Sequence, residues 1–401
     1  MSDTHPAPSR ARRVLLAASI VLIAFNLRPL FGSLSVLLPE IMASTGLSPA
    51  GASLLTTLPV LCLGLFAFPA PALARRFGTE RTLLGALLLL VMGTLLRGLG
   101  SLPLLFAASA MGGAGIAVGN VLLPGLVKRD FPRQAPLLTG CYTLAICAGA
   151  ASATGLTVPL ERGLLGGSWQ AALALWALPA AAVVLLWAPQ AWAARSHPQH
   201  AGPARPSLWR NRLAWQVTCF MGLQSALAYA AIGWLAPILR ERGLEAASAG
   251  YVVAASIGIQ LLTCFVTPTI ATRRADQRAI GIATTLLTTA ASLAFLFAPL
   301  EGGLVWLWAA LLGAGQGGAF ALALSLIVLR SPDAATAAQL SGMAQGAGYL
   351  ISISGPLLVG LLRGWTGSFD ASALLFITLG VLLAMSAAGA GRALLVRPAL
   401  P

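Results

Sequence analysis

Arg28 lies near the centre of the first long apolar segment, residues 14–39, where a charged side chain is expensive. An arginine at the middle of a membrane-spanning helix costs at least about 2.5–3.5 kcal/mol on insertion scales. The 11 Asp and Glu residues all fall at the ends of apolar segments or between them, so no buried carboxylate is predicted to pair with Arg28. Backbone carbonyls, water and an anionic solute are its remaining partners.

Pro29 follows Arg28 directly and alters the helix at that point. A proline removes one helical hydrogen bond, here to the carbonyl of Phe25, and favours a kink. A guanidinium beside such a kink can bind a planar oxyanion through two parallel hydrogen bonds. We therefore predict that Arg28 binds the negative group of a substrate. The alternative is a structural arginine, satisfied by freed carbonyls and neighbouring amides.

Neutral polar side chains recur one helical turn apart on several other apolar segments. They can line a cavity with hydrogen bonds and no charge, or they can join neighbouring helices, as such residues commonly do. Cys147 and Gln260 lie on two of these stripes, but we do not assign them to the site. The predicted substrate-binding residues are Arg28, Asn26, Asn120, Tyr142, Thr143, Gln224, Tyr229, Gln316 and Gln345.

The composition explains which elements position these residues. Of the 401 residues, 58% are hydrophobic and 9% are charged, whereas a soluble domain carries about 25% charged residues. This excludes an ordinary soluble enzyme, a disordered protein and a coiled coil, and it fits an all-α chain in a lipid bilayer. The net charge of +14 does not indicate nucleic acid binding, because cytoplasmic loops of membrane proteins collect Arg and Lys.

Metal and cofactor chemistry has little material in this chain. The 5 cysteines lie in apolar segments without CxxC spacing, and the 3 histidines lie in the N-terminal tail and in a polar linker. Neither a metal site nor a disulfide framework is indicated. We predict no metal, no cofactor and no enzymatic activity.

Twelve apolar segments are long enough to span a membrane, since about 20 residues suffice. The first runs on too long for the core of a cleavable signal peptide. The longest polar stretch, residues 190–212, is basic and separates the sixth segment from the seventh. The predicted spans are 14–39, 49–74, 81–99, 103–127, 135–160, 169–189, 213–239, 247–271, 279–298, 303–329, 336–362 and 370–391.

The basic residues predict the topology. With a cytoplasmic N-terminus, 19 of the 25 Lys and Arg residues fall in inner loops and tails, as the positive-inside rule requires. The outer loops then hold Arg97, Arg162, Arg240, Arg242 and Arg363. The predicted parts are an N-terminal cytoplasmic tail (1–13), a six-helix bundle (14–189), a cytoplasmic linker (190–212), a second bundle (213–391) and a C-terminal cytoplasmic tail (392–401).

The two halves repeat each other. Asn26 and Pro39 recur 198 residues later as Gln224 and Pro237, and "LTG" (138–140) parallels "LSG" (340–342). Two parallel six-helix halves are typical of the major facilitator superfamily, whose substrate lies between the halves near the midplane. Glycine clusters at 112–119 and 313–318 indicate close helix packing, because no phosphate-loop context accompanies them.

Four segments resemble the cyanate/nitroimidazole transporter family (CynX/NimT) of this superfamily. They are "AFNLRPLFGSLSVLLPEI" (24–41), "LLTTLPVLCLGLFAFPAPALARRFGTER" (54–81), "GAGIAVGNVLLPGLVKRDFP" (113–132) and "TGCYT" (139–143). The resemblance implies that Arg28 faces an anion or a nitro group. It also places Asn120 and Tyr142 within the strings of the family.

The loop "RRFGTER" (75–81) is similar to the cytoplasmic DRxGRR signature of the superfamily. Arg76 and Gly78 match, while Arg75 stands where an aspartate is expected. The charge pairing that latches the halves would then involve Glu80 and Asp130. The predicted gating residues are Arg75, Arg76, Gly78, Glu80, Lys128, Arg129 and Asp130.

These features predict a secondary active transporter of a small anionic or nitro-type solute, working by alternating access in a bacterial inner membrane. No Asp, Glu or His lies away from the ends of the spans to relay a proton. A co-transported proton would have to travel with the substrate, with water, or through a carboxylate at the mouth such as Glu40 or Glu161. The alternatives are an exporter of amphipathic drugs or metabolites, which the missing GPxxGG exporter signature weakens, and a membrane receptor or assembly subunit that moves nothing.

Overall fold

The computed structural model describes residues 10–193 and 208–396. Residues 1–9, 194–207 and 397–401 fall outside the described part. Most of the predicted N-terminal tail and of the linker 190–212, and half of the predicted C-terminal tail, therefore lie outside the described residues.

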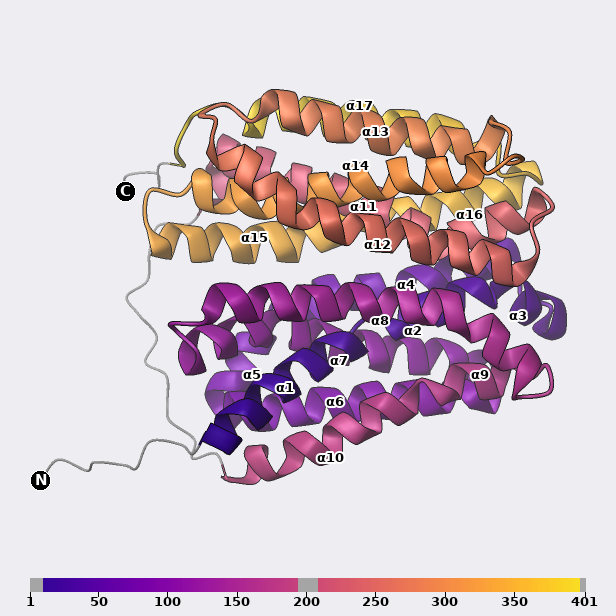
Figure 1. Cartoon of the computed structure of the whole chain (residues 1–401), viewed down its shortest axis with the longest axis horizontal. Helices are drawn as coiled ribbons and strands as arrows, with labels where there is room; N and C mark the ends of the chain where they lie inside the picture. The colour runs from indigo at the N-terminus through magenta and orange to yellow at the C-terminus, as the bar shows by residue number, and fades with distance from the viewer. Residues whose placement is uncertain (1–9, 194–207, 397–401) are drawn as a thin grey trace, which may run out of the picture.

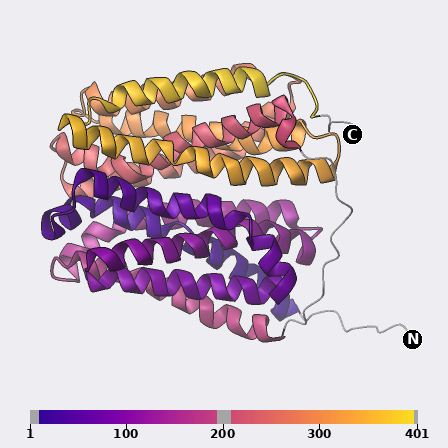
Figure 2. The same ribbon diagram turned by 180° about the vertical axis from the view of Figure 1, so that it is seen from behind.

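The described residues form helices arranged in two halves (Figure 1). In Figure 1 the first half, indigo to magenta, lies below the second half, pink to yellow. Figure 2 shows the same separation from behind. The first half contains α1 (Arg10–Asn26), α2 (Pro29–Val36), α3 (Leu38–Thr45), α4 (Pro49–Ala67), α5 (Ala70–Phe77), α6 (Thr79–Leu96), η1 (Arg97–Leu99), α7 (Leu102–Asp130), α8 (Ala135–Gly163), α9 (Trp169–Leu175) and α10 (Ala177–Ala193).

The second half begins with a short 3₁₀ turn and continues with longer helices. These are η2 (Leu208–Arg210), α11 (Arg212–Glu241), α12 (Ala246–Thr272), α13 (Arg278–Phe297), α14 (Leu304–Leu329), α15 (Ala334–Ser352), α16 (Ser354–Thr366) and α17 (Ser372–Ala390). Within the described residues, 12 spans are long and apolar enough to cross a membrane. The predicted twelve-span, two-half, all-α architecture is confirmed.

Several spans are broken, which explains why the helices outnumber the spans. The first span breaks between Asn26 and Pro29, as the sequence predicts from Pro29. The second span was expected to be continuous over 49–74, but it breaks at Phe68 and Pro69. The sixth and eleventh spans also break, at Trp176 and Ile353. A proline cannot supply the backbone N–H that continues the hydrogen-bond pattern, so Pro29 and Pro69 account for two of these breaks.

Side-chain caps determine where several helices begin. Ser48 accepts a hydrogen bond from the backbone N–H of Gly51, and Ser168 does the same for Ala171. Such caps satisfy backbone donors that the first helical turn leaves free. Gly46 ends α3 with a φ of +68°, a left-handed conformation that glycine adopts without steric cost.

Both glycine clusters pack against a neighbouring helix. A Cβ added at Gly115 would lie 2.4 Å from the carbonyl oxygen of Ala86, and one at Gly313 would lie 2.1 Å from that of Ser256. Only a residue without a Cβ permits α7 to approach α6, and α14 to approach α12, this closely. The packing interpretation of these clusters is confirmed.

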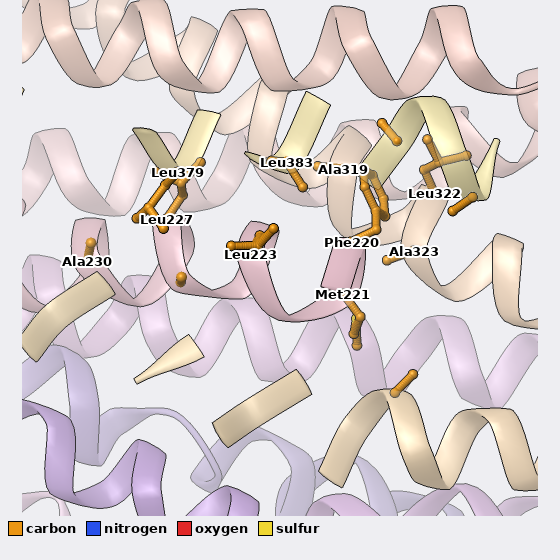
Figure 3. Packing of buried hydrophobic residues seen from close by; sticks show 14 of the residues in the cluster. Phe220, Met221, Leu223, Leu227, Ala230, Ala319, Leu322, Ala323, Leu379 and Leu383 are labelled. Carbon is orange, nitrogen blue, oxygen red and sulfur yellow. The ribbon is translucent and has the colours of Figure 1, made fainter. Parts of the chain in front are cut away.

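A buried apolar cluster holds the second half together around α11 (Figure 3). Phe220 of α11 and Leu383 of α17 are fully buried, and Leu322 of α14 is nearly so. Figure 3 shows these side chains meeting between the three helices. Close packing of this kind keeps side chains in fixed positions. It therefore also fixes the positions of the polar residues of α11, such as Gln224 and Tyr229.

Arg97 lies in η1, at the end of the third span. Its side chain is 0% exposed, although a charged residue at the end of a span is usually solvated. Its Nη1 donates to the carbonyl oxygen of Leu30 in α2, at 2.9 Å. Hydropathy cannot reveal this burial, because it depends on the neighbouring helices that cover the end of α6.

Candidate functional site

A cavity of about 280 Å³ lies between the two halves. The first half contributes residues from α7, α8 and the turn between α1 and α2, and the second half contributes residues from α11, α12, α14 and α15. Its polar lining consists of Arg28, Asn120, Tyr142, Thr143, Cys147, Gln224, Ser225, Tyr229, Gln260, Cys264, Gln345 and Tyr349.

Arg28 occupies the turn at the break between α1 and α2. Its Nη1 donates a hydrogen bond to the hydroxyl oxygen of Tyr229 at 2.9 Å, across the boundary between the halves. Its guanidinium carbon lies 5.7 Å from the ring centroid of Phe31 and 5.5 Å from that of Tyr229. Aromatic faces at this distance attract a cation. Because the Tyr229 oxygen accepts from Arg28, its own O–H remains able to donate to a solute.

The lining of the cavity carries one kind of charge. Among the described residues that line the cavity, Arg28 carries a charge, and none is Asp, Glu, His or Lys. Three of the 4 tyrosines of the chain also line it. The cavity therefore offers a positive charge, phenolic hydroxyls and carboxamides to whatever occupies it.

The cavity brings together most of the residues that the sequence predicts for substrate binding. They are Arg28, Asn120, Tyr142, Thr143, Gln224, Tyr229 and Gln345. Asn26 and Gln316 lie elsewhere. Asn26 donates to the carbonyl of Leu22 at 2.9 Å, and Gln316 donates to the carbonyl of Leu227 at 3.5 Å. Asn26 therefore bonds its own helix α1, Gln316 joins α14 to α11, and neither lines the cavity.

Sequence reasoning missed several lining residues, and Tyr349 is the most prominent of them. Its side chain is buried and follows Gln345 by one turn on α15. Residues four apart on a helix share a face, so the spacing from Gln345 could have identified it. The same spacing relates Cys264 to Gln260 on α12. Ser225, Cys147 and Gln260 itself complete the polar lining residues that were not predicted.

The halves are closed against each other on one side of the cavity, which we call the Glu40 end. There Arg240 Nη1 lies 2.7 Å from Glu40 Oε2, and Arg162 Nη1 lies 2.5 Å from Glu245 Oε1. Two further hydrogen bonds join the halves on the same side: Ser35 Oγ donates to Gly233 O at 3.1 Å, and Ser53 Oγ donates to Leu357 O at 2.5 Å.

A second cavity lies on the opposite side, towards what we call the Arg129 end. This cavity, which we call the vestibule, has a volume of about 530 Å³. It is lined by residues of α4, α5, α7, η2 and α15, and also by Phe68 between α4 and α5. Asn120, Pro124 and Gln345 line both cavities. The central cavity therefore adjoins the vestibule at these three residues.

The predicted gating residues gather at the Arg129 end within the first half. Arg129 lies 2.5 Å from Glu80 and 2.7 Å from Asp130. These pairs involve the acids expected to replace the missing aspartate. The Arg129–Glu80 pair joins α6 to α7 and the Arg129–Asp130 pair lies within α7, so neither joins one half to the other. Gly78 links α5 to α6 with a φ of +86°.

The other predicted gating residues lie on the surface around this ion pair. Arg75 and Arg129 line a groove of about 190 Å³. The guanidinium of Arg76 lies 5.2 Å from the Phe77 ring centroid, and Lys128 is exposed. Among the described residues, no group of three or more His, Cys, Asp and Glu could hold a metal ion.

Comparison with known proteins agrees with this architecture. Residues 14–356 match the model of the Major Facilitator Superfamily. The 2-nitroimidazole transporter of Escherichia coli (strain K12) is 39% identical over 391 residues, covering 96% of this chain and 97% of that protein. The cyanate transport protein CynX of the same organism is 31% identical over 353 residues, covering 87% and 90%. The chain belongs to the cyanate/nitroimidazole transporter family of the major facilitator superfamily.

A solved structure shows the same fold for this transporter. A bacterial homolog of the human lysosomal transporter Spinster superposes with a TM-score of 0.77 at 15% identity, covering 96% of this chain and 97% of that one. The chain is thus a multi-pass membrane transporter of the superfamily, and the family resemblance predicted from its sequence is confirmed.

Proposed function

We propose that this transporter moves a small solute carrying a negative charge or a nitro group, by secondary active transport with alternating access. The observation that carries the proposal is Arg28, the charged side chain of a cavity between the halves. Without a carboxylate in the lining, the positive charge of Arg28 is left for a solute to neutralise. Charges attract more strongly in a cavity with a low-dielectric wall than in water.

The chemistry of Arg28 suits both solute types. A guanidinium presents parallel N–H groups that match the two oxygens of a carboxylate or another planar oxyanion. A nitro group presents a similar pair of oxygens. The relatives named as transporters of 2-nitroimidazole and of cyanate support a solute with a nitro group or with a negative charge. Tyr142, Tyr229 and Tyr349 would donate further hydrogen bonds or stack on a ring.

The volume of the cavity favours a solute of one ring or smaller. Its volume of about 280 Å³ lies just below the range of ligand pockets, which typically measure about 300–1,000 Å³. The second candidate, an exporter of amphipathic compounds, draws support from the apolar residues Leu123, Ile146 and Phe320 in the lining. The small volume and the unpaired charge favour the first candidate.

The proposed cycle assigns a state to this structure. If both termini face the cytoplasm of a bacterial inner membrane, the Arg129 end is cytoplasmic and the Glu40 end is external. The closed Glu40 end and the vestibule then correspond to a carrier open to the inside. Alternating access requires a second state in which the ion pairs at the Glu40 end separate and the Arg129 end closes.

Transport by purified protein in liposomes tests the proposal. We expect uptake of 2-nitroimidazole or cyanate by the wild type and its loss in Arg28→Ala. Arg278→Ala is the matched control, because Arg278 pairs with Asp276 outside the cavity. Equal uptake by Arg28→Ala and wild type would contradict the proposal, and flux of bulky amphipathic compounds alone would favour the exporter. Imposing a pH gradient in the same assay shows whether a proton is co-transported.

A further inference from the structure

Asn120 and Gln345 face the passage between the central cavity and the vestibule from opposite halves. Asn120 lies on α7 of the first half and Gln345 on α15 of the second half, and both line both cavities. A solute that moves from the central cavity to the vestibule must pass these two side chains. Their position makes them candidates for more than contact with a bound solute.

The two carboxamides have complementary free hydrogen-bonding groups, a donor on Asn120 and an acceptor on Gln345. The Nδ2 of Asn120 is buried and has no hydrogen-bond partner among the described residues. The Nε2 of Gln345 donates to Ser341 Oγ at 2.9 Å, which orients the amide and leaves its carbonyl oxygen as an acceptor. Buried polar groups in native proteins nearly always have partners. An unpaired donor and an available acceptor on two residues that line the same passage are suited to a bond that forms when the halves move.

The helix that carries Asn120 can move at this point. Pro124 lies in the interior of α7, four residues after Asn120. A proline there removes the hydrogen bond to the carbonyl of Asn120 and permits a bend. On the other helix, Gly346 lies next to Gln345, and a Cβ at Gly346 would lie 2.6 Å from the ring of Phe68. The passage is therefore bordered by a deformable segment and by a close contact between the halves.

We propose that Asn120 and Gln345 form the inner gate of the transporter. When the Arg129 end closes, Asn120 Nδ2 donates to the Gln345 carbonyl oxygen and seals the central cavity from the vestibule. The inference rests on the proposed transport function and gives Asn120 and Gln345 a gating role in place of the solute binding predicted for them from the sequence. In this account a neutral hydrogen bond closes the Arg129 end, whereas ion pairs close the Glu40 end.

Disulfide trapping tests the gate without any solute. The experiment uses Asn120→Cys with Gln345→Cys in a chain whose 5 native cysteines are replaced by serine. We expect a cross-link on oxidation, formed faster when Glu40→Gln weakens the opposite end, and unaffected by Glu241→Gln, whose partner Arg363 lies in the same half. If both thiols react with a maleimide but no cross-link forms in any background, the gate is wrong.

Binding and flux together separate a gate from a solute contact. For Asn120→Ala and Gln345→Ala we expect an affinity for 2-nitroimidazole within about twofold of wild type, measured by ligand-induced thermal stabilisation. The maximum rate should fall roughly fivefold, the equivalent of one net hydrogen bond, and the double variant should lose no more than either single variant. Gln339→Ala is the control, because Gln339 lines the vestibule alone.

Two outcomes of this comparison have opposite meanings. Loss of binding in the single variants, multiplied in the double variant, would make both residues solute contacts and overturn the gate. If the wild type neither binds nor moves the tested solutes, the proposed function fails, while the cross-link still reports whether the two residues meet.

Discussion

At the scale of the residue, Arg28 combines a position that is unfavourable in lipid with surroundings that compensate for it. Tyr229 accepts a hydrogen bond from it at 2.9 Å, and the rings of Tyr229 and Phe31 lie within cation–π distance. None of these partners is negative. The arginine is therefore stabilised without being neutralised, as a receptor for an anion or a nitro group requires.

Replacing Tyr229 tests how far this arrangement depends on the phenolic oxygen. Tyr229→Phe keeps the ring and removes the acceptor for Arg28. Hydrogen bonds to charged groups contribute about 1.5–3 kcal/mol, so we expect the KM for uptake to rise roughly tenfold or more. Tyr251→Phe is the control, because Tyr251 is exposed and lies outside the cavity lining. An unchanged KM in Tyr229→Phe would mean that Tyr229 does not position Arg28.

The residues of the site differ in how visible they are in the sequence. A charge in an apolar run identifies Arg28 without further information. Asn26 and Asn120 look alike in the sequence, since each is a neutral amide in an apolar run. In the structure Asn26 donates to its own helix, whereas Asn120 lines the cavity. Hydropathy gives the depth of a residue along a span but not the direction in which it points. Tyr349 was missed because a tyrosine in an apolar helix is typical of a core.

At the scale of the element, the broken first span places Arg28. Pro29 leaves the carbonyl of Phe25 without its helical donor, and this carbonyl faces Gly149 on α8. A Cβ at Gly149 would lie 2.0 Å from the Phe25 oxygen. The two helices can therefore meet at the break only because residue 149 is a glycine, and this contact fixes the turn that carries Arg28.

Gly149→Ala should force α1 and α8 apart. Overpacking of this kind typically costs about 1–3 kcal/mol, so we expect a lower midpoint of thermal unfolding in detergent and reduced uptake. Gly125→Ala is the matched control: this helical glycine has nothing within 4 Å of an added Cβ, and alanine favours a helix by up to about 1 kcal/mol. Equal midpoints for both variants would contradict the close contact.

The sequence predicts the twelve spans more completely than the breaks within them. All twelve spans follow from runs of apolar residues, and the break at Pro29 follows from the proline itself. The breaks at Trp176 and Ile353 each lie three residues before a proline, Pro179 and Pro356, which cannot donate to the carbonyls of Leu175 and Ser352, where α9 and α15 end. Pro124 lies inside the unbroken helix α7, so a proline alone does not show where a span breaks.

At the scale of the whole molecule, the two ends of the cavity differ. The Glu40 end joins the halves through the pairs Glu40–Arg240 and Glu245–Arg162. At the Arg129 end, the ion pairs of Arg129 stay within the first half, next to the vestibule. The relative position of the halves is a property of the tertiary structure, and the sequence predicts only that two halves exist.

Glu40→Gln should shift the carrier towards the state open at the Glu40 end. A partly exposed ion pair contributes up to about 1 kcal/mol, so we expect a roughly twofold to fivefold faster reaction of cavity thiols with a membrane-impermeant reagent. Because the proposed topology makes the Glu40 end external, the reagent is added outside cells that express a variant retaining only Cys147 and Cys264, the two cysteines of the cavity lining.

Glu241→Gln is the control for this change. Glu241 pairs with Arg363 at the same end but within the second half, so its loss should leave the thiol reaction rate unchanged. Equal acceleration in both variants would indicate a general loosening of the protein rather than opening of one end.

The most direct test of the role of Arg28 is a thermal-shift screen of the purified protein with and without Arg28→Ala. The solutes are cyanate, nitrate, nitrite, bicarbonate, small carboxylates and 2-nitroimidazole. A ligand at 100 times its dissociation constant stabilises a fold by about 2.7 kcal/mol. We expect at least one of these solutes to raise the unfolding midpoint of the wild type and to leave Arg28→Ala unchanged. An equal shift in both proteins, or stabilisation by bulky cations and none of these solutes, would contradict an anion or nitro group bound at Arg28.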